Sequence, residues 1–116
     1  MEAFESLDVW RRGCRLAVDV HRVLKNSKDY GFKDQAFRSA LSVPSNVAEG
    51  YERGSRKEFI RFLHIAKGSC GELRTQLYIG IAADILDEKV AHNCVNEAAE
   101  LSRMLQGLIS KLQSSQ

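Results

Sequence analysis

The sequence predicts an all-α protein: a single antiparallel four-helix bundle with up-down-up-down topology that spans residues 1–116. Four segments repeat apolar residues every three or four positions, which is the periodicity of an amphipathic helix. Short polar connections separate these segments, and no stretch of useful length alternates apolar and polar residues as a strand does. With 116 residues, 44% hydrophobic and 28% charged, the chain can build one core and is too short for two.

The first segment, residues 7–26, is apolar over about half of its circumference. Its main seam advances in steps of three and four through Leu7, Trp10, Cys14, Ala17, His21 and Leu24. A second stripe beside this seam consists of Val9, Leu16, Val20 and Val23. A helix with so wide an apolar arc has more than one neighbour to pack against. Residues 26–31 then form a predicted connection.

The second segment, residues 33–51, contains Pro44 in its interior. Proline removes one backbone hydrogen bond and clashes with the preceding turn, at a cost of about 3 kcal/mol. We therefore predict that this helix is kinked near residues 41–44, with two shorter helices as the alternative.

The third and fourth segments have clear start signals. Ser55 followed by Glu58 fits a capping box, and the helix that it opens runs to about Ala83. Asp87 is the predicted N-cap of the fourth helix, after a tight link at residues 84–87. The fourth helix has the most regular heptads of the chain, and residues 114–116 should fray.

The basic residues are concentrated in the first part of the chain, although the net charge is only +2. Residues 1–67 carry 13 Lys and Arg against 9 Asp and Glu, whereas residues 68–116 carry 4 against 6. Several basic side chains form stripes that are suited to contact RNA phosphates. The candidate nucleic-acid-binding residues are Arg11, Arg15, Arg22, Arg56, Lys57 and Arg61. The alternative is a solvated face whose charge is offset by acidic neighbours, and no interleaved aromatic residues indicate base stacking.

Two further features are candidates for an oligomer interface or a polar network. A polar line follows the second segment and consists of Arg38, Ser42, Asn46, Glu49 and Arg53. Such a line is either surface decoration, worth about 0.3 kcal/mol per pair, or a network at a subunit contact. Gly68 and Gly71 lie inside the third helix, where each costs about 1 kcal/mol relative to alanine. Two glycines three residues apart indicate a close approach of another helix backbone, within the chain or in an assembly.

The sequence contains no recognisable catalytic, metal-binding or cofactor-binding constellation. None of the three histidines follows a glutamate by three residues, as the metal sites of ferritin-like bundles require. Arg15 and His21 match the spacing of a pair found in some helical ribonucleases, but six residues turn a helix by about 600°, so the two side chains diverge. No glycine-rich loop follows a strand to hold phosphates. We predict a non-enzyme that needs no metal and no cofactor.

Three features concern the compartment. The three cysteines are far apart and form no Cys-x-x-Cys pair, which fits a reducing environment. The first five residues are acidic and lack the basic start and apolar core of a signal peptide. No apolar run approaches the roughly 20 residues that span a bilayer, so we expect no membrane association.

Two motifs in the chain resemble a known family. The first spans residues 42–50 and has the sequence Ser-x-Pro-x-Asn-x-Ala-Glu-Gly. The second spans residues 66–73 and has the sequence Ala-Lys-Gly-Ser-x-x-Glu-Leu. Together with Phe-x-x-Leu-x-Val-Trp at residues 4–10, they are similar to the four-helix bundle proteins encoded in the intervening sequences of bacterial 23S rRNA. The resemblance covers residues 4 to about 80, and the last helix matches only in pattern.

The resemblance implies a bacterial, cytoplasmic protein that forms a homo-oligomer, commonly a pentameric ring, without an established enzymatic activity. Similar accessory proteins of diversity-generating retroelements also form basic pentameric rings, which bind nucleic acid and a reverse transcriptase. We therefore expect a non-enzymatic homo-oligomer, with the pentamer as the favoured form, that binds RNA or a ribonucleoprotein. The alternative is a structural assembly or adaptor protein that binds another protein and has no nucleic-acid role.

Overall fold

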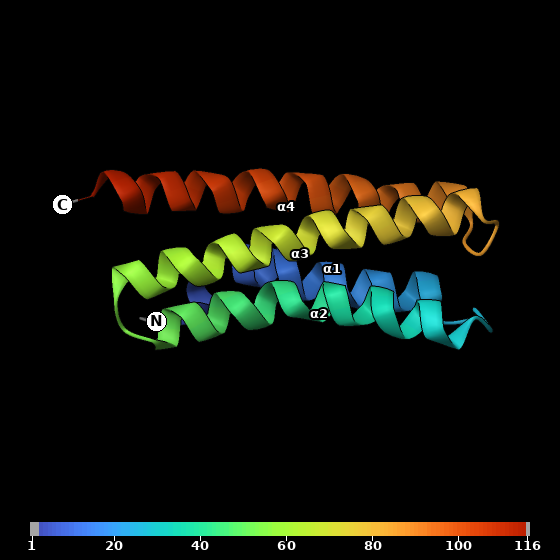
Figure 1. Cartoon of the computed structure of the whole chain (residues 1–116), viewed down its shortest axis with the longest axis horizontal. Helices are drawn as coiled ribbons and strands as arrows, with labels where there is room; N and C mark the ends of the chain where they lie inside the picture. Colours follow the sequence, from blue (N-terminus) through green and yellow to red (C-terminus); the bar gives the residue numbers. More distant parts are fainter. Residues whose placement is uncertain (1–2, 116) are drawn as a thin grey trace.

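The computed structural model describes residues 3–115 and confirms the predicted fold class: four long helices, with no strand in this part of the chain, pack together as a bundle. After a short 3-10 helix, η1 (Phe4–Ser6), the bundle consists of α1 (Asp8–Leu24), α2 (Tyr30–Glu52), α3 (Arg56–Ala82) and α4 (Glu88–Ser114). Successive helices run in alternate directions along the long axis of a body of 48 × 21 × 20 Å (Figure 1). Met1, Glu2 and Gln116, which the predicted domain and tail include, lie outside the described residues.

The four helices occupy the corners of a square cross-section. Each helix packs against the next one along the chain, and α1 also packs against α4, whereas the diagonal pairs α1–α3 and α2–α4 make no close backbone contact. The wide apolar arc of α1 is explained by these two neighbours. All four helices contribute to one core, whose fully buried side chains include Leu16, Leu24, Val43, Val47, Leu63, Leu73, Leu77, Leu101, Leu105 and Ile109. None of the described helices combines the length and the apolar character that crossing a membrane requires.

Side-chain caps fix the starts of α3 and α4 where the sequence predicts them. The Ser55 hydroxyl oxygen accepts a hydrogen bond from the Glu58 backbone N–H at 3.2 Å. In the same way, an Asp87 carboxylate oxygen accepts one from the Val90 backbone N–H at 3.1 Å. Each bond satisfies one of the backbone donors that a helix start leaves free. The Glu58 carboxylate pairs with Arg61 at 3.1 Å rather than returning to the cap.

The start of α2 differs from the prediction. The helix begins at Tyr30, three residues before the predicted Lys33. Asp29 is the reason, because its carboxylate oxygen accepts a hydrogen bond from the Phe32 backbone N–H at 3.2 Å and so caps the helix. Apolar periodicity alone places Asp29 in the connection, because the capping role of its side chain does not affect that pattern.

Pro44 lies inside an uninterrupted helix, so the alternative of two shorter helices is wrong. The ribbon of α2 curves gently near its middle (Figure 1), which is compatible with the kink predicted there. The Pro44 ring packs against Gly13 of α1, where an added Cβ would lie 3.3 Å from two of the ring carbons. This close crossing joins α1 to α2 at a point where neither helix carries a large side chain.

The link between α3 and α4 is the tight turn that the sequence predicts. It passes through Asp84, whose φ of 60° lies in the left-handed region. The Gly80 carbonyl oxygen accepts hydrogen bonds from the backbone N–H groups of Ile85 at 2.8 Å and Leu86 at 3.1 Å. An added Cβ at Gly80 would lie 2.7 Å from both Leu86 Cδ1 and Phe32 Cζ, so these two side chains fill the space over the glycine.

Candidate functional site

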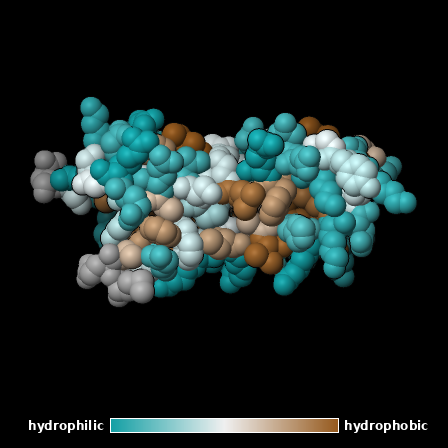
Figure 2. All heavy atoms as spheres, turned by 90° about the horizontal axis from the view of Figure 1, so that it is seen from below, coloured by the Kyte–Doolittle hydropathy of each residue, from teal (hydrophilic) through white to brown (hydrophobic). Residues whose placement is uncertain are grey.

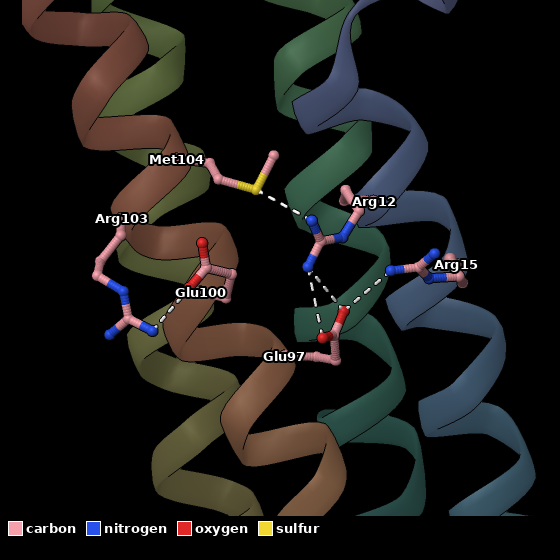
Figure 3. Close-up of polar contacts among 6 residues, drawn as sticks. All are labelled: Arg12, Arg15, Glu97, Glu100, Arg103 and Met104. Carbon is pink, nitrogen blue, oxygen red and sulfur yellow. Dashed lines mark hydrogen bonds and ion pairs between the residues drawn. The ribbon is translucent and has the colours of Figure 1, made fainter.

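The side of α1 that borders α4 carries two arginines around one carboxylate (Figure 3). Arg12 Nη2 donates to both carboxylate oxygens of Glu97, at 3.1 and 3.4 Å, and Arg15 Nη2 donates to Oε1 at 3.2 Å. Arg12 Nη1 also lies 3.5 Å from Met104 Sδ. The hydrogen bond from Arg12, reinforced by Arg15, lowers the pKa of the Glu97 carboxyl below its ordinary value. The sequence analysis missed Arg12 and Glu97, because periodicity does not show which residues of α4 face α1.

The arginines predicted on the first helix are exposed, but their charges are paired. Arg11 pairs with Asp8 at 3.3 Å and Arg22 with Asp19 at 3.8 Å, in both cases one turn away on α1. Arg15 pairs with α4 instead. Exposed ion pairs of this kind contribute only about 0–1 kcal/mol, so a phosphate can displace the carboxylate. The stripe is therefore exposed, with part of its positive charge already offset by carboxylates.

The second predicted group lies at the start of α3 and consists of Arg56, Lys57 and Arg61. Arg61 pairs with Glu58 through Nε and Nη2, both at 3.1 Å, and its guanidinium lies 4.6 Å from the centroid of the Phe62 ring. Arg56 donates to the backbone carbonyl of Ser115, just beyond α4. Because α1 and α3 are diagonal in the bundle, the two predicted groups occupy separate surfaces. The structure does not unite the six residues in one patch.

The polar line on α2 divides between a contact inside the chain and the outer surface. Ser42 Oγ and Ser69 Oγ of α3 lie 2.8 Å apart, and Asn46 Nδ2 donates to the Ser42 carbonyl at 2.7 Å. The Ser42–Ser69 contact therefore joins α2 to α3 within one chain, whereas the Asn46 bond lies within α2. Arg53 and Glu49 form an exposed ion pair at 2.8 Å. Such a pair fits surface decoration and a subunit contact equally, so both alternatives stay predictions.

Gly68 and Gly71 adjoin open space. A Cβ added at either glycine would meet no atom of the surrounding structure within 4 Å, so another helix backbone does not approach them inside the described chain. The assembly alternative stays a prediction. A close approach occurs instead at Gly50 of α2, where an added Cβ would lie 2.5 Å from Phe62 Cβ. Arg38, the one candidate interface residue not yet described, is exposed on α2.

An apolar groove runs between α1 and α2, and the sequence analysis did not anticipate it. Its lining residues are Cys14, Ala17, Val18, His21, Phe37, Leu41 and Pro44. Figure 2 views the molecule from the side of α2 and shows an apolar patch in the middle of this face. Val18 and Leu41 are 48% and 44% exposed, and the rings of His21 and Phe37 lie 5.4 Å apart. The available signal was Val18, an apolar residue that belongs to neither predicted stripe.

The residues considered for catalysis do not converge. Arg15 contacts α4, whereas His21 contacts α2, so the two side chains diverge as the helix geometry predicts. No three His, Cys, Asp or Glu side chains among residues 3–115 gather in a group that could hold a metal ion. Burial raises the pKa of the Cys70 and Cys94 thiols to about 11. These thiols stay protonated at neutral pH and are poor nucleophiles there.

Comparison with known proteins identifies a sequence family and solved structures with a similar fold. The sequence model of a family described as 23S rRNA-intervening sequence protein matches residues 5–107. The fold is similar to the crystal structure of a protein of unknown function from the S23 ribosomal protein family of Bacteroides thetaiotaomicron, with a TM-score of 0.81. The two chains are 23% identical, and the alignment covers 87% of this chain and 97% of the other. No curated protein matches the chain.

Proposed function

The chain belongs to the family of 23S rRNA-intervening sequence proteins, and on that premise we propose that it is a non-enzymatic bundle protein that self-associates and, as an assembly, binds RNA or a ribonucleoprotein. The observation that carries this proposal is the apolar groove between α1 and α2. Contiguous exposed apolar surface marks a contact site, because a partner that covers it removes it from water.

A second copy of the chain is the occupant we propose for the groove. The chain also exposes Ile65 and Ile79 on α3, to 41% and 55%, on either side of the open Gly68 and Gly71. The groove lies between α1 and α2, so these two surfaces would meet in a heterologous contact. Such a contact, repeated by rotation, closes into a ring. The pentamer that the family resemblance implies is one such ring.

The arginines of α1 support an RNA partner for the assembly. The side chains of Arg11, Arg15 and Arg22 are 57%, 60% and 73% exposed. In a ring each of these arginines recurs once per subunit, so together they form a belt of positive charge around the assembly. Phosphates that bind such a belt release counterions from the RNA, which favours association at low salt.

We also propose that the protein acts in the bacterial cytoplasm, as the resemblance implies. Cys14, Cys70 and Cys94 are all free thiols in the structure. Free cysteines persist in reducing compartments, and this supports the assignment.

Self-association is tested by light scattering at micromolar concentration, together with alkylation of Cys14. Because Cys14 lines the groove and is partly exposed, its alkylation should slow as the protein concentration rises. Val18→Glu places a charge in the groove and should give the monomer. Val90→Glu is the matched control, because Val90 is 47% exposed on α4 and does not line the groove. A monomeric wild-type protein contradicts the proposal.

RNA binding is tested by fluorescence anisotropy with a labelled RNA hairpin at about 50 mM salt. The wild-type protein should bind, and its affinity should fall as the salt concentration rises. Replacement of Arg11, Arg15 and Arg22 by glutamine should flatten this salt dependence while the circular dichroism stays unchanged. An assembled protein that binds no RNA would instead be a structural or adaptor protein for another protein.

A further inference from the structure

The turn between α1 and α2 presents an exposed aromatic ring beside lysines. Tyr30, the first residue of α2, is 67% exposed, more than any other exposed large apolar side chain of the described residues. Lys33 Nζ lies 5.9 Å from the centroid of the Tyr30 ring and donates to the Lys25 backbone carbonyl at 3.2 Å. The ring therefore lies near a positioned positive charge while most of its surface faces solvent.

The lysines of this turn differ from most arginines of the molecule. Ion pairs with carboxylates are formed by Arg11, Arg12, Arg15, Arg22, Arg53, Arg61 and Arg103. Lys25, Lys28 and Lys33 form no ion pair with a carboxylate of residues 3–115. A phosphate can therefore bind these ammonium groups without first displacing a carboxylate.

Two carboxylates lie close to the turn in sequence, and one of them already accepts a hydrogen bond from the backbone. Asp29 accepts the hydrogen bond from the Phe32 backbone N–H that caps α2. Asp34 is exposed and offsets part of the lysine charge. A Cβ added at Gly31, the next residue, would meet no atom of the other described residues within 4 Å, so the helix surface at this position is open.

We propose that residues 25–33 bind an unpaired segment of RNA, with one base stacked on the Tyr30 ring and neighbouring phosphates on Lys25 and Lys28. The inference rests on the proposed RNA binding and adds a surface and a form of RNA that the arginines of α1 do not specify. A stack between a base and an aromatic side chain contributes about 1–3 kcal/mol. Because a duplex hides its base faces in the helical stack, the segment that binds here is a loop, a bulge or a single strand.

The test compares forms of RNA and single side chains in the full-length protein. Fluorescence anisotropy at about 50 mM salt measures the affinity for a labelled single-stranded oligoadenylate and for a duplex RNA of the same length. We expect the single strand to bind more tightly, Tyr30→Ala to weaken its binding about tenfold, and Tyr30→Phe, which keeps the ring, to leave it unchanged. Lys28→Gln should lower the slope of log affinity against log salt by about 0.7, the value for one phosphate contact on a single strand.

Tyr78 supplies the matched control. Its side chain is 48% exposed in the last turns of α3. The link that follows α3 lies at the same end of the bundle as the turn between α1 and α2 (Figure 1), and it contains Asp84 and Asp87 rather than lysines. Tyr78→Ala should therefore leave the binding of oligoadenylate unchanged. Circular dichroism of each variant establishes that the helices are intact.

The outcomes separate the inference from the proposed function. If the wild-type protein binds RNA and Tyr30→Ala binds as tightly, the inference is wrong and the proposed function stands. Equal affinity for the duplex and the single strand also overturns it, because charge alone then accounts for binding. If Tyr30→Ala lowers the mass measured by light scattering, the turn is a protein contact and the inference is wrong. A wild-type protein that binds no RNA of either form overturns both proposals.

Discussion

Glycines lie at two places beside α3, one on the facing surface of α2 and one within α3 itself, and the chain fills only the first. At the crossing of α2 and α3, a Cβ added at Gly50 would lie 2.5 Å from Phe62 Cβ. In the middle of α3, Gly68 and Gly71 adjoin open space. A glycine in a helix interior costs about 1 kcal/mol relative to alanine. At Gly50 the close contact with α3 offsets that cost, whereas at Gly68 and Gly71 no contact with the rest of residues 3–115 does. The space at the α2–α3 contact is therefore filled by the chain's own side chains. The space beside Gly68 and Gly71, on the outer surface of α3, stays open.

The largest effect that this comparison predicts is at the filled crossing. Gly50→Ala should destabilise the protein by about 3 kcal/mol, because Phe62 Cβ is attached directly to the backbone of α3 and cannot rotate away. Denaturant unfolding followed by circular dichroism measures the change. Gly107→Ala is the control, since Gly107 is exposed in α4 with nothing within 4 Å. If Gly50→Ala is as stable as the wild-type protein, the backbones of α2 and α3 can move apart at this crossing to accommodate a methyl group.

The buried side of the open stretch gives a prediction about pH. Cys70 lies between the two open glycines but faces the core, and burial raises the pKa of its thiol from 9.0 to about 11. Because the pKa is higher in the folded than in the unfolded chain, the protonated thiol stabilises the fold. This stabilisation is complete below pH 9 and is lost as the pH rises towards 11, by an amount on the order of 2 kcal/mol.

Comparison with Cys70→Ala isolates the contribution of this thiol to the loss of stability at alkaline pH. The variant is expected to be less stable at neutral pH, because it leaves a cavity, and to lose less stability between pH 9 and 11. If the free energy of unfolding of the two proteins falls equally between pH 9 and 11, the thiol does not control this loss.

Gly80 is intermediate between Gly50 and the open glycines, because the space beside it is filled by the flexible ends of side chains. An added Cβ would lie 2.7 Å from Leu86 Cδ1 and Phe32 Cζ, but these atoms are the ends of side chains that can shift. We expect Gly80→Ala to cost about 1–2 kcal/mol, less than Gly50→Ala. The difference between the two unfolding midpoints measures how much the rigidity of the neighbour matters. A larger loss at Gly80 would reverse the ranking and contradict this argument.

The positions of the helices were predictable because their signals are local. Ser55 and Asp87 precede apolar periodicity and cap α3 and α4 as expected. Asp29 is an equally local signal that the sequence analysis overlooked. The fold class follows from four such segments, since short connections leave antiparallel packing as the simple arrangement.

The surfaces were less predictable because they depend on contacts between distant residues. Pro44, which lines the groove, packs against Gly13, and neither residue alone shows that the other is its neighbour. The pairing of Arg15 with Glu97 joins α1 to α4 across a sequence separation of 82 residues. Single-sequence periodicity identifies which face of a helix is apolar, but not which partner helix lies beside each edge of that face.

The smallest expected effect is at the open stretch, and it has the opposite sign. Gly68→Ala should stabilise the isolated chain by up to about 1 kcal/mol, because alanine favours the helix and the added methyl meets no atom. Gly68→Leu should also fold, but its side chain would project from α3 where the proposed neighbouring subunit approaches. Unfolding midpoints together with light scattering therefore separate the two roles of the glycine. If Gly68→Leu keeps both the stability and the assembled mass of the wild-type protein, the open glycine serves no subunit contact, and the heterologous contact must use another surface.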